Sequence, residues 1–177
     1  MLDVAIVDDE EDVRAELEQM VRRFCAQEGE RVAVREYADG AELLDAAAAS
    51  AHDVILLDIE MSQVNGMDAA HELRRRGVGT QIVFVTNMAQ YAIRGYEVGA
   101  FDFVVKPVEY PVFAFKFKRV LEAVCSRRRD LVNLETKDGF VRLDAADILY
   151  VEVRGHKLTY HTAHGPVGVW GTMKAAT

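Results

Sequence analysis

Short apolar runs alternate with segments of helical periodicity through the first 125 residues of the chain. The runs are rich in Val, Ile, Leu and Phe and are bounded by polar residues, which is typical of strands. Several of them are apolar at nearly every position, as strands are when a sheet is covered on both faces. Five runs predict strands, over residues 2–7, 31–37, 53–58, 81–86 and 101–105.

Helical segments are predicted between these strands. Apolar residues between the first two strands recur at spacings of three and four, which predicts one buried helix face. Further helices are expected around 43–48, after Gly66, over 89–98 and over 112–124. Strands that alternate with helices predict a doubly wound α/β fold, a five-stranded parallel sheet with helices on both faces. Its expected flavodoxin-like strand order is 2-1-3-4-5.

The pattern changes after Cys125. Residues 125–130 form a polar, arginine-rich connector, and short alternating stretches separated by turn residues follow it. We therefore expect a first domain over residues 1–124, a linker over 125–130 and a small all-β module over 131–177.

Charge and cysteine content narrow the function classes. Residues 1–125 carry 13 Lys and Arg against 23 Asp and Glu, whereas residues 126–177 carry 8 against 6. The acidic first part is thus a poor surface for binding nucleic acid, whereas the charge of the second part permits such binding. Cys25 and Cys125 have no metal or redox spacing, and no apolar stretch is long enough to span a bilayer. A soluble, cytoplasmic protein without a membrane partner is expected.

Polar residues stand at the ends of four predicted strands: Asp8 and Asp9, then Asp58, Thr86 and Lys106. Ligands of open parallel sheets bind at the carboxyl ends of the strands, so these side chains are expected to meet. Carboxylates that lie close together need a cation, and a hard ion such as Mg²⁺ prefers oxygen ligands. With Mg²⁺ and Lys106 to neutralise a phosphoryl group and Thr86 to donate a hydrogen bond, Asp58 becomes a candidate nucleophile.

Four motifs carry a family resemblance: "IVDDEE", "LLDIEM" with Gly66 eight residues after the aspartate, "FVTN" and "FDFVVKP". Together they resemble the receiver domain of two-component response regulators. The resemblance implies that Asp58 accepts a phosphoryl group from a sensor histidine kinase. It also implies that Asp8, Asp9, Asp58 and the backbone carbonyl of Glu60 hold Mg²⁺. Such a protein signals rather than acting as an enzyme on a separate substrate.

The same resemblance assigns the residues around the phosphate. Thr86 and Phe103 would form a switch pair, and Lys106 would bind the phosphate and precede a cis peptide bond to Pro107. The chain departs from the family at two positions, with Ser62 where Pro is usual and Asn87 where a small residue is usual. Asn87 is expected to slow access of phosphodonor and water.

Residues 91–107 and 147–162 resemble regulators that carry a LytTR DNA-binding domain. By this resemblance His156 contacts a base, and Arg154 and Lys157 contact phosphates of promoter DNA. Phosphorylation would favour a homodimer through the face of helix 4, strand 5 and helix 5. A LytTR domain is about twice as long as the segment after the linker. We therefore expect residues 131–177 to be its first half, with an open apolar face and poor stability alone.

Two alternatives remain at this point. One is a phosphorelay or protein-interaction receiver whose shortened output half does not bind DNA. A phosphotransferase or phosphatase with an aspartyl intermediate needs an acid two residues after the nucleophile, and Glu60 occupies that position. No cap or substrate-binding insertion accompanies Glu60.

Overall fold

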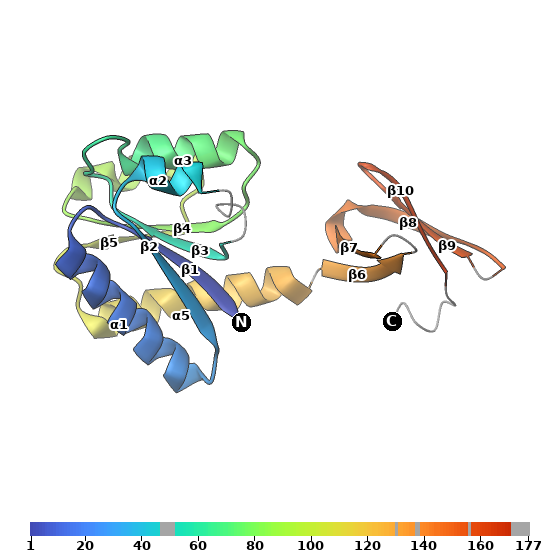
Figure 1. Cartoon of the computed structure of the whole chain (residues 1–177), viewed down its shortest axis with the longest axis horizontal. Helices are drawn as coiled ribbons and strands as arrows, with labels where there is room; N and C mark the ends of the chain where they lie inside the picture. The colour runs from blue at the N-terminus through green and yellow to red at the C-terminus, as the bar shows by residue number, and fades with distance from the viewer. Residues whose placement is uncertain (47–51, 130, 137–138, 156, 171–177) are drawn as a thin grey trace. The chain divides into compact units, whose positions relative to one another are not determined.

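The structure, a computed structural model, describes residues 1–46, 52–129, 131–136, 139–155 and 157–170. The chain divides into two compact units, Met1–Val124 and Cys125–Thr177 (Figure 1).

The first unit is built on the predicted parallel sheet. Its strands are β1 (Leu2–Val7), β2 (Val32–Tyr37), β3 (Val54–Leu57), β4 (Gln81–Thr86) and β5 (Asp102–Val105). All neighbours pair in parallel, in the order β2-β1-β3-β4-β5, which confirms the expected topology. β3 and the last five residues of β4 are buried throughout, as the sequence pattern predicts for strands covered on both faces.

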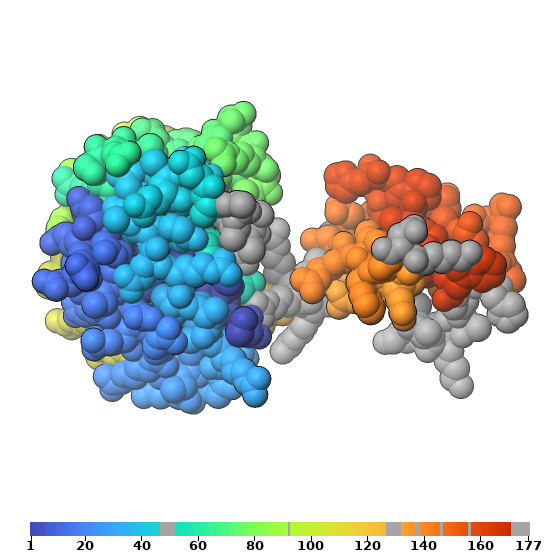
Figure 2. All heavy atoms as spheres, viewed as in Figure 1, coloured from blue at the N-terminus to red at the C-terminus, as the bar shows by residue number. Residues whose placement is uncertain are grey.

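Helices cover the two faces of this sheet. α1 (Glu11–Glu28) and α5 (Tyr110–Arg129) lie on one face, and α2 (Gly40–Asp45) and α3 (Gly66–Arg75) lie on the other (Figure 1). In the first unit, residues of α1, β2 and α2 form much of the surface that faces the viewer in Figure 2. The apolar core therefore lies in two layers, and polar side chains of this unit gather where the strands end.

Strand register places these polar ends side by side. Val7 pairs with Leu57, and Thr86 pairs with Val105. The residues that follow β1, β3 and β5 consequently leave the sheet at the same edge. The fold thus brings the loops after three different strands to one place.

The prediction of one continuous helix over residues 89–98 is wrong. The segment consists of a 3₁₀ turn (Ala89–Tyr91), the short α4 (Ala92–Gly95) and another 3₁₀ turn (Tyr96–Val98). The N-terminal end of α4 has no side-chain cap, and Gly95 is a weak helix former. Gly99, at φ 60°, ends the segment.

α5 continues to Arg129, so helix occupies most of the segment that we expected to be a linker, residues 125–130. The residues from Val112 to Arg129 include neither Gly nor Pro, and Arg is a good helix former. The polar composition of this segment indicated a connector but gave no helix stop signal.

The second unit holds two small antiparallel sheets. β6 (Leu131–Thr136) pairs with β7 (Gly139–Asp144), and β8 (Ile148–Arg154), β9 (Lys157–Thr162) and β10 (Gly165–Trp170) form the order β10-β9-β8. Leu134 of β6 is buried together with Leu158, Tyr160 and Val169. The inner side of the described three-stranded sheet is thus covered, whereas Leu149, Tyr150, Val153 and Trp170 of the same sheet are exposed. β6 and β7 supply the side chains that cover the inner side.

Candidate functional site

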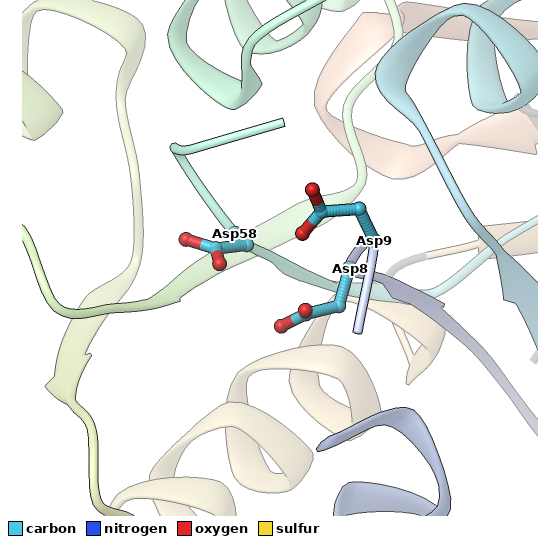
Figure 3. A group of neighbouring side chains, drawn as sticks. All are labelled: Asp8, Asp9 and Asp58. Carbon is cyan, nitrogen blue, oxygen red and sulfur yellow. The ribbon is translucent and has the colours of Figure 1, made fainter. Parts of the chain in front are cut away.

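Three carboxylates converge where β1 and β3 end. Asp8 and Asp9 follow β1, Asp58 follows β3, and one carboxylate oxygen from each lies within 4.8 Å of the other two (Figure 3). Asp8 and Asp58 are only 1% and 4% exposed, whereas Asp9 is exposed. Two buried acids and one accessible acid thus share a small volume that opens to solvent through Asp9.

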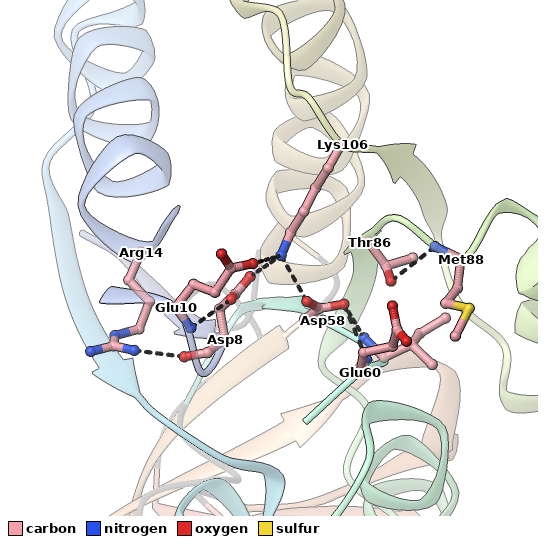
Figure 4. A network of polar contacts seen from close by, with 9 residues as sticks. Asp8, Glu10, Arg14, Asp58, Glu60, Thr86, Met88 and Lys106 are labelled. Atoms are coloured by element: carbon pink, nitrogen blue, oxygen red, sulfur yellow. Dashed lines mark hydrogen bonds and ion pairs between the residues drawn. The ribbon is translucent and has the colours of Figure 1, made fainter. Parts of the chain in front are cut away.

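Lys106 brings the positive charge to this cluster. Its Nζ lies 2.8 Å from Asp8 Oδ2 and 2.7 Å from Asp58 Oδ2 (Figure 4). Burial opposes the charged form of Lys106, but the hydrogen bonds to both carboxylates outweigh burial and raise the pKa of the lysine. Lys106 therefore stays protonated, and its peptide bond to Pro107 is cis, as predicted.

One lysine does not neutralise three acids. Burial, and to a smaller extent the charge of Asp58, raises the pKa of Asp8 although Lys106 donates to it. The donors are all carboxylate oxygens on three nearby side chains, which is the ligand chemistry of a hard divalent ion. Asp8, Asp9 and Asp58 therefore fit Mg²⁺.

The backbone holds Asp58 from the other side. Its Oδ1 accepts hydrogen bonds from the amides of Ile59 and Glu60, the latter at 3.2 Å. Gly66 lies so close that a Cβ there would be 1.9 Å from the carbonyl oxygen of Asp58. The loop after β3 thus closes tightly over the residue that precedes it, and only glycine allows this approach.

Thr86 is the last residue of β4, and Phe103 is the second residue of β5. Thr86 is fully buried, and its Oγ1 accepts a 3.3 Å hydrogen bond from the amide of Met88 (Figure 4). Phe103 is half-buried, with its ring centroid 6.2 Å from that of Phe84. Asn87, next to Thr86, is exposed. In this arrangement the Thr86 hydroxyl is bound to its own loop.

A model of the response regulator receiver domain matches residues 4–114, which is more than half of the chain. The chain belongs to the response regulator receiver family. Receivers are signalling proteins, and this assignment agrees with the acidic cluster at the end of the sheet. Within the part of the chain that the structure describes, no helix is long and apolar enough to cross a membrane.

Curated relatives include LytTR-family regulators. A response regulatory protein of Yersinia pestis is 34% identical over 132 residues, which are 75% of this chain and 50% of that protein. LytT of Bacillus cereus is 28% identical over 176 residues, covering 92% of this chain and 70% of LytT. The positive alginate biosynthesis regulatory protein of Pseudomonas aeruginosa is 30% identical over 67% of this chain and 46% of its own length. The chain thus spans about half to seven-tenths of these relatives.

Solved receivers have the same fold. The response regulatory domain of mrkE from Klebsiella pneumoniae superposes with a TM-score of 0.64, covering 71% of this chain and 99% of that domain, at 23% identity. TrrA of Thermotoga maritima, solved in complex with Mg²⁺ and beryllium fluoride, gives a TM-score of 0.58 at 26% identity. It covers 68% of this chain and 99% of TrrA.

Two of the residues expected to contact DNA, Arg154 and Lys157, are described by the structure and belong to the second unit. Arg154 ends β8 and Lys157 begins β9, and both are exposed. Nε and one terminal nitrogen of Arg154 each lie 2.8 Å from Glu152 Oε1, so a phosphate would compete with this carboxylate. His156 lies outside the described residues.

Sequence reasoning missed three side chains that support the receiver site. Glu10 lies 3.6 Å from Lys106 Nζ, and Arg14 donates from a terminal nitrogen to the carbonyl oxygen of Asp8 at 2.7 Å (Figure 4). Asp39 accepts hydrogen bonds from the loop after β3. Glu10 adjoins the acidic pair in sequence, and Arg14 lies in the first turns of α1. These sequence positions could have identified Glu10 and Arg14 as neighbours of the site. The sequence around Asp39 shows only a helix-capping pattern.

Proposed function

We propose that this protein is a phosphorylation-controlled regulator in which Asp58 accepts a phosphoryl group from a sensor histidine kinase. The observation that carries the proposal is the buried Asp58 carboxylate, held 2.7 Å from the Lys106 ammonium beside Asp8 and Asp9. A carboxylate oxygen of Asp58 attacks phosphorus as the bond to the kinase's histidine nitrogen breaks, and an acyl phosphate forms. The displaced imidazole leaves with its electron pair.

Each residue has a defined task in this proposal. Asp8, Asp9, Asp58 and the Glu60 carbonyl would hold Mg²⁺, which supplies positive charge for the phosphoryl oxygens when bound. Lys106 supplies a second positive charge, since its raised pKa keeps it protonated. That TrrA is described in complex with Mg²⁺ and beryllium fluoride supports this assignment by similarity.

The switch is the second part of the proposal. The Thr86 hydroxyl leaves the Met88 amide and donates to the phosphoryl group, and Phe103 turns inward. The half-buried position of Phe103 leaves its ring room to move. Phe103 is part of β5, and Thr86 pairs with Val105 of the same strand, so the rearrangement would reach the surface of α4, β5 and α5.

Phosphorylation is tested by the intact mass of the protein after incubation with Mg²⁺ and acetyl phosphate. We expect wild type to gain one phosphoryl group and Asp58→Asn to gain none. Asp53→Asn is the matched control, because Asp53 precedes the same strand at its other end. Equal gains in wild type and Asp58→Asn would refute the proposal.

The output is proposed to be promoter DNA binding by a LytTR-type module, because the relatives are LytTR-family regulators. Arg154 and Lys157 would contact phosphates, and His156 would contact a base. A gel-shift titration at rising salt tests this, since loss of each phosphate contact lowers the salt dependence of binding. Unchanged salt dependence in Arg154→Ala and Lys157→Ala would favour the alternative, a receiver that acts only through protein contacts. We propose a cytoplasmic location for the protein, whether it binds DNA or acts only through protein contacts.

A further inference from the structure

The loop of residues 59–65, between β3 and α3, carries the Glu60 carbonyl and has no regular secondary structure. Its ends are fixed near the site. The amide of Glu60 donates to Asp58 Oδ1, and the amide of Gly66 donates to the Ile59 carbonyl at 3.0 Å. The middle of the loop needs separate support, because these contacts do not reach residues 62–64.

Asp39 supplies that support from the loop that precedes α2. Its side chain is nearly enclosed, and the residue is 4% exposed. Oδ2 accepts from the amide of Gln63 at 2.8 Å, and Oδ1 accepts from the amides of Val64 at 3.1 Å and Ala41 at 2.8 Å. A buried carboxylate is costly unless it is hydrogen-bonded, and these backbone donors meet that need.

Burial opposes ionisation of Asp39, but the hydrogen bonds from the amides of Ala41, Gln63 and Val64 outweigh burial and keep the pKa of Asp39 below its ordinary value. Asp39 is therefore ionised at neutral pH. Its negative charge strengthens each hydrogen bond to the loop.

Gly40 shows how closely the two loops approach. A Cβ at Gly40 would lie 2.5 Å from the carbonyl oxygen of Val64. The start of α2 therefore contacts the loop through backbone as well as through Asp39. Two successive residues, 39 and 40, fix the path of the chain past Val64.

We propose that Asp39 is a positioning residue for the Asp58 site. By holding the amides of Gln63 and Val64, it keeps the loop that carries the Glu60 carbonyl in the conformation that binds Mg²⁺. This inference rests on the proposed function.

The test uses Asp39→Ser. A serine oxygen can still cap α2 at the Ala41 amide, but a single short hydroxyl cannot also hold Gln63 and Val64. Amide exchange of Gln63 and Val64 and the Mg²⁺ dissociation constant, followed at the Glu60 amide, are measured by NMR on the full chain. We expect faster exchange at both amides and Mg²⁺ binding weakened on the order of tenfold, as for other residues that orient metal ligands.

Two further variants separate positioning from stability. Val21→Ala removes buried volume from α1, away from the loop, and should destabilise the protein while leaving Mg²⁺ affinity within twofold of wild type. Ser62→Pro in the Asp39→Ser protein should recover part of the lost affinity. An Asp39→Ser affinity no weaker than that of Val21→Ala would overturn the inference alone. Wild type without measurable Mg²⁺ binding would overturn the proposed function as well.

Discussion

At the residue scale, Lys106 balances the charge of the site. Its ammonium lies between the two buried carboxylates of Asp8 and Asp58, and its side chain is only 8% exposed. An unpaired buried carboxylate is strongly destabilising, so the stability of the protein without metal depends on this lysine. A bound divalent ion would meet the same need, because it would contact the same two acids.

Lys106→Met tests this balance. Without Mg²⁺ we expect the free energy of unfolding to fall by about 3 kcal/mol, since both acids lose their cation. Saturating Mg²⁺ should recover more stability in the variant than it adds to wild type. Urea denaturation of both proteins, with and without Mg²⁺, measures the difference. An equal Mg²⁺ effect on the two proteins would show that the ion and the lysine do not serve the same carboxylates.

The main residues of the site could be predicted from the sequence, but one of its supporting residues could not. Asp8, Asp9, Asp58 and Lys106 could be placed together, because parallel strands deliver their ends to one edge. Asp39 could not be linked to the site, since its partners lie 24 and 25 positions away and depend on how two loops pack. Local sequence shows only that an aspartate precedes a helix.

At the element scale, the turn from β3 into α3 sets the shape of the site. Gly66 is the first residue of α3, and its amide closes the loop on Ile59. Asn65 caps the helix by accepting from the amide of Asp68 at 2.9 Å. The path of this turn, and with it the backbone that holds Asp58, depends on the absence of a side chain at position 66.

Gly66→Ala is expected to destabilise the protein by roughly 1–3 kcal/mol, because its Cβ would meet the Asp58 backbone and the core would have to shift. Gly95→Ala is the matched control. A Cβ at Gly95 meets only ordinary contacts at 3.6 Å or more, and alanine favours helix. Thermal unfolding compares the two. A Gly66→Ala protein as stable as Gly95→Ala would contradict the tight turn.

Residues 89–98, before β5, form the segment whose secondary structure the sequence predicted least well. The strands follow from apolar runs, and their observed bounds lie within one residue of the predicted ones at each end. α1 lies between the first two strands, where apolar spacing predicted a helix. The helix expected over 89–98 breaks into turns, because its periodicity is weak and Gly95 interrupts it. A segment with such weak local preference is well suited to rearrange when Thr86 moves.

At the scale of the whole molecule, the proposed switch acts through an exposed apolar surface on the first unit. Ile93 and Tyr96 are 80% and 83% exposed, beside a hollow of about 540 Å³ that Phe103 and Arg119 also line. Asp102 binds Lys116 and Arg119 along the same edge, so both charge signs are present. A surface that is apolar and carries both signs can pair with a second copy of itself.

Tyr96→Glu tests this homodimer. We expect wild type with Mg²⁺ and acetyl phosphate to sediment as a dimer, and the variant to remain a monomer while still gaining its phosphoryl group. Phe140→Glu, at an exposed position in the second unit, should dimerise as wild type does. Analytical ultracentrifugation gives the masses. A Tyr96→Glu protein that dimerises normally would exclude this surface as the interface.

Mapping the modified residue tests the central claim most directly. The protein is incubated with Mg²⁺ and acetyl phosphate and then treated with borohydride, which reduces an acyl phosphate to an alcohol, and its peptides are sequenced by mass spectrometry. We predict reduction at Asp58, abolished by removing Mg²⁺ with a chelator. Reduction at another carboxylate, or none in the presence of Mg²⁺, would contradict the proposal that Asp58 receives the phosphoryl group.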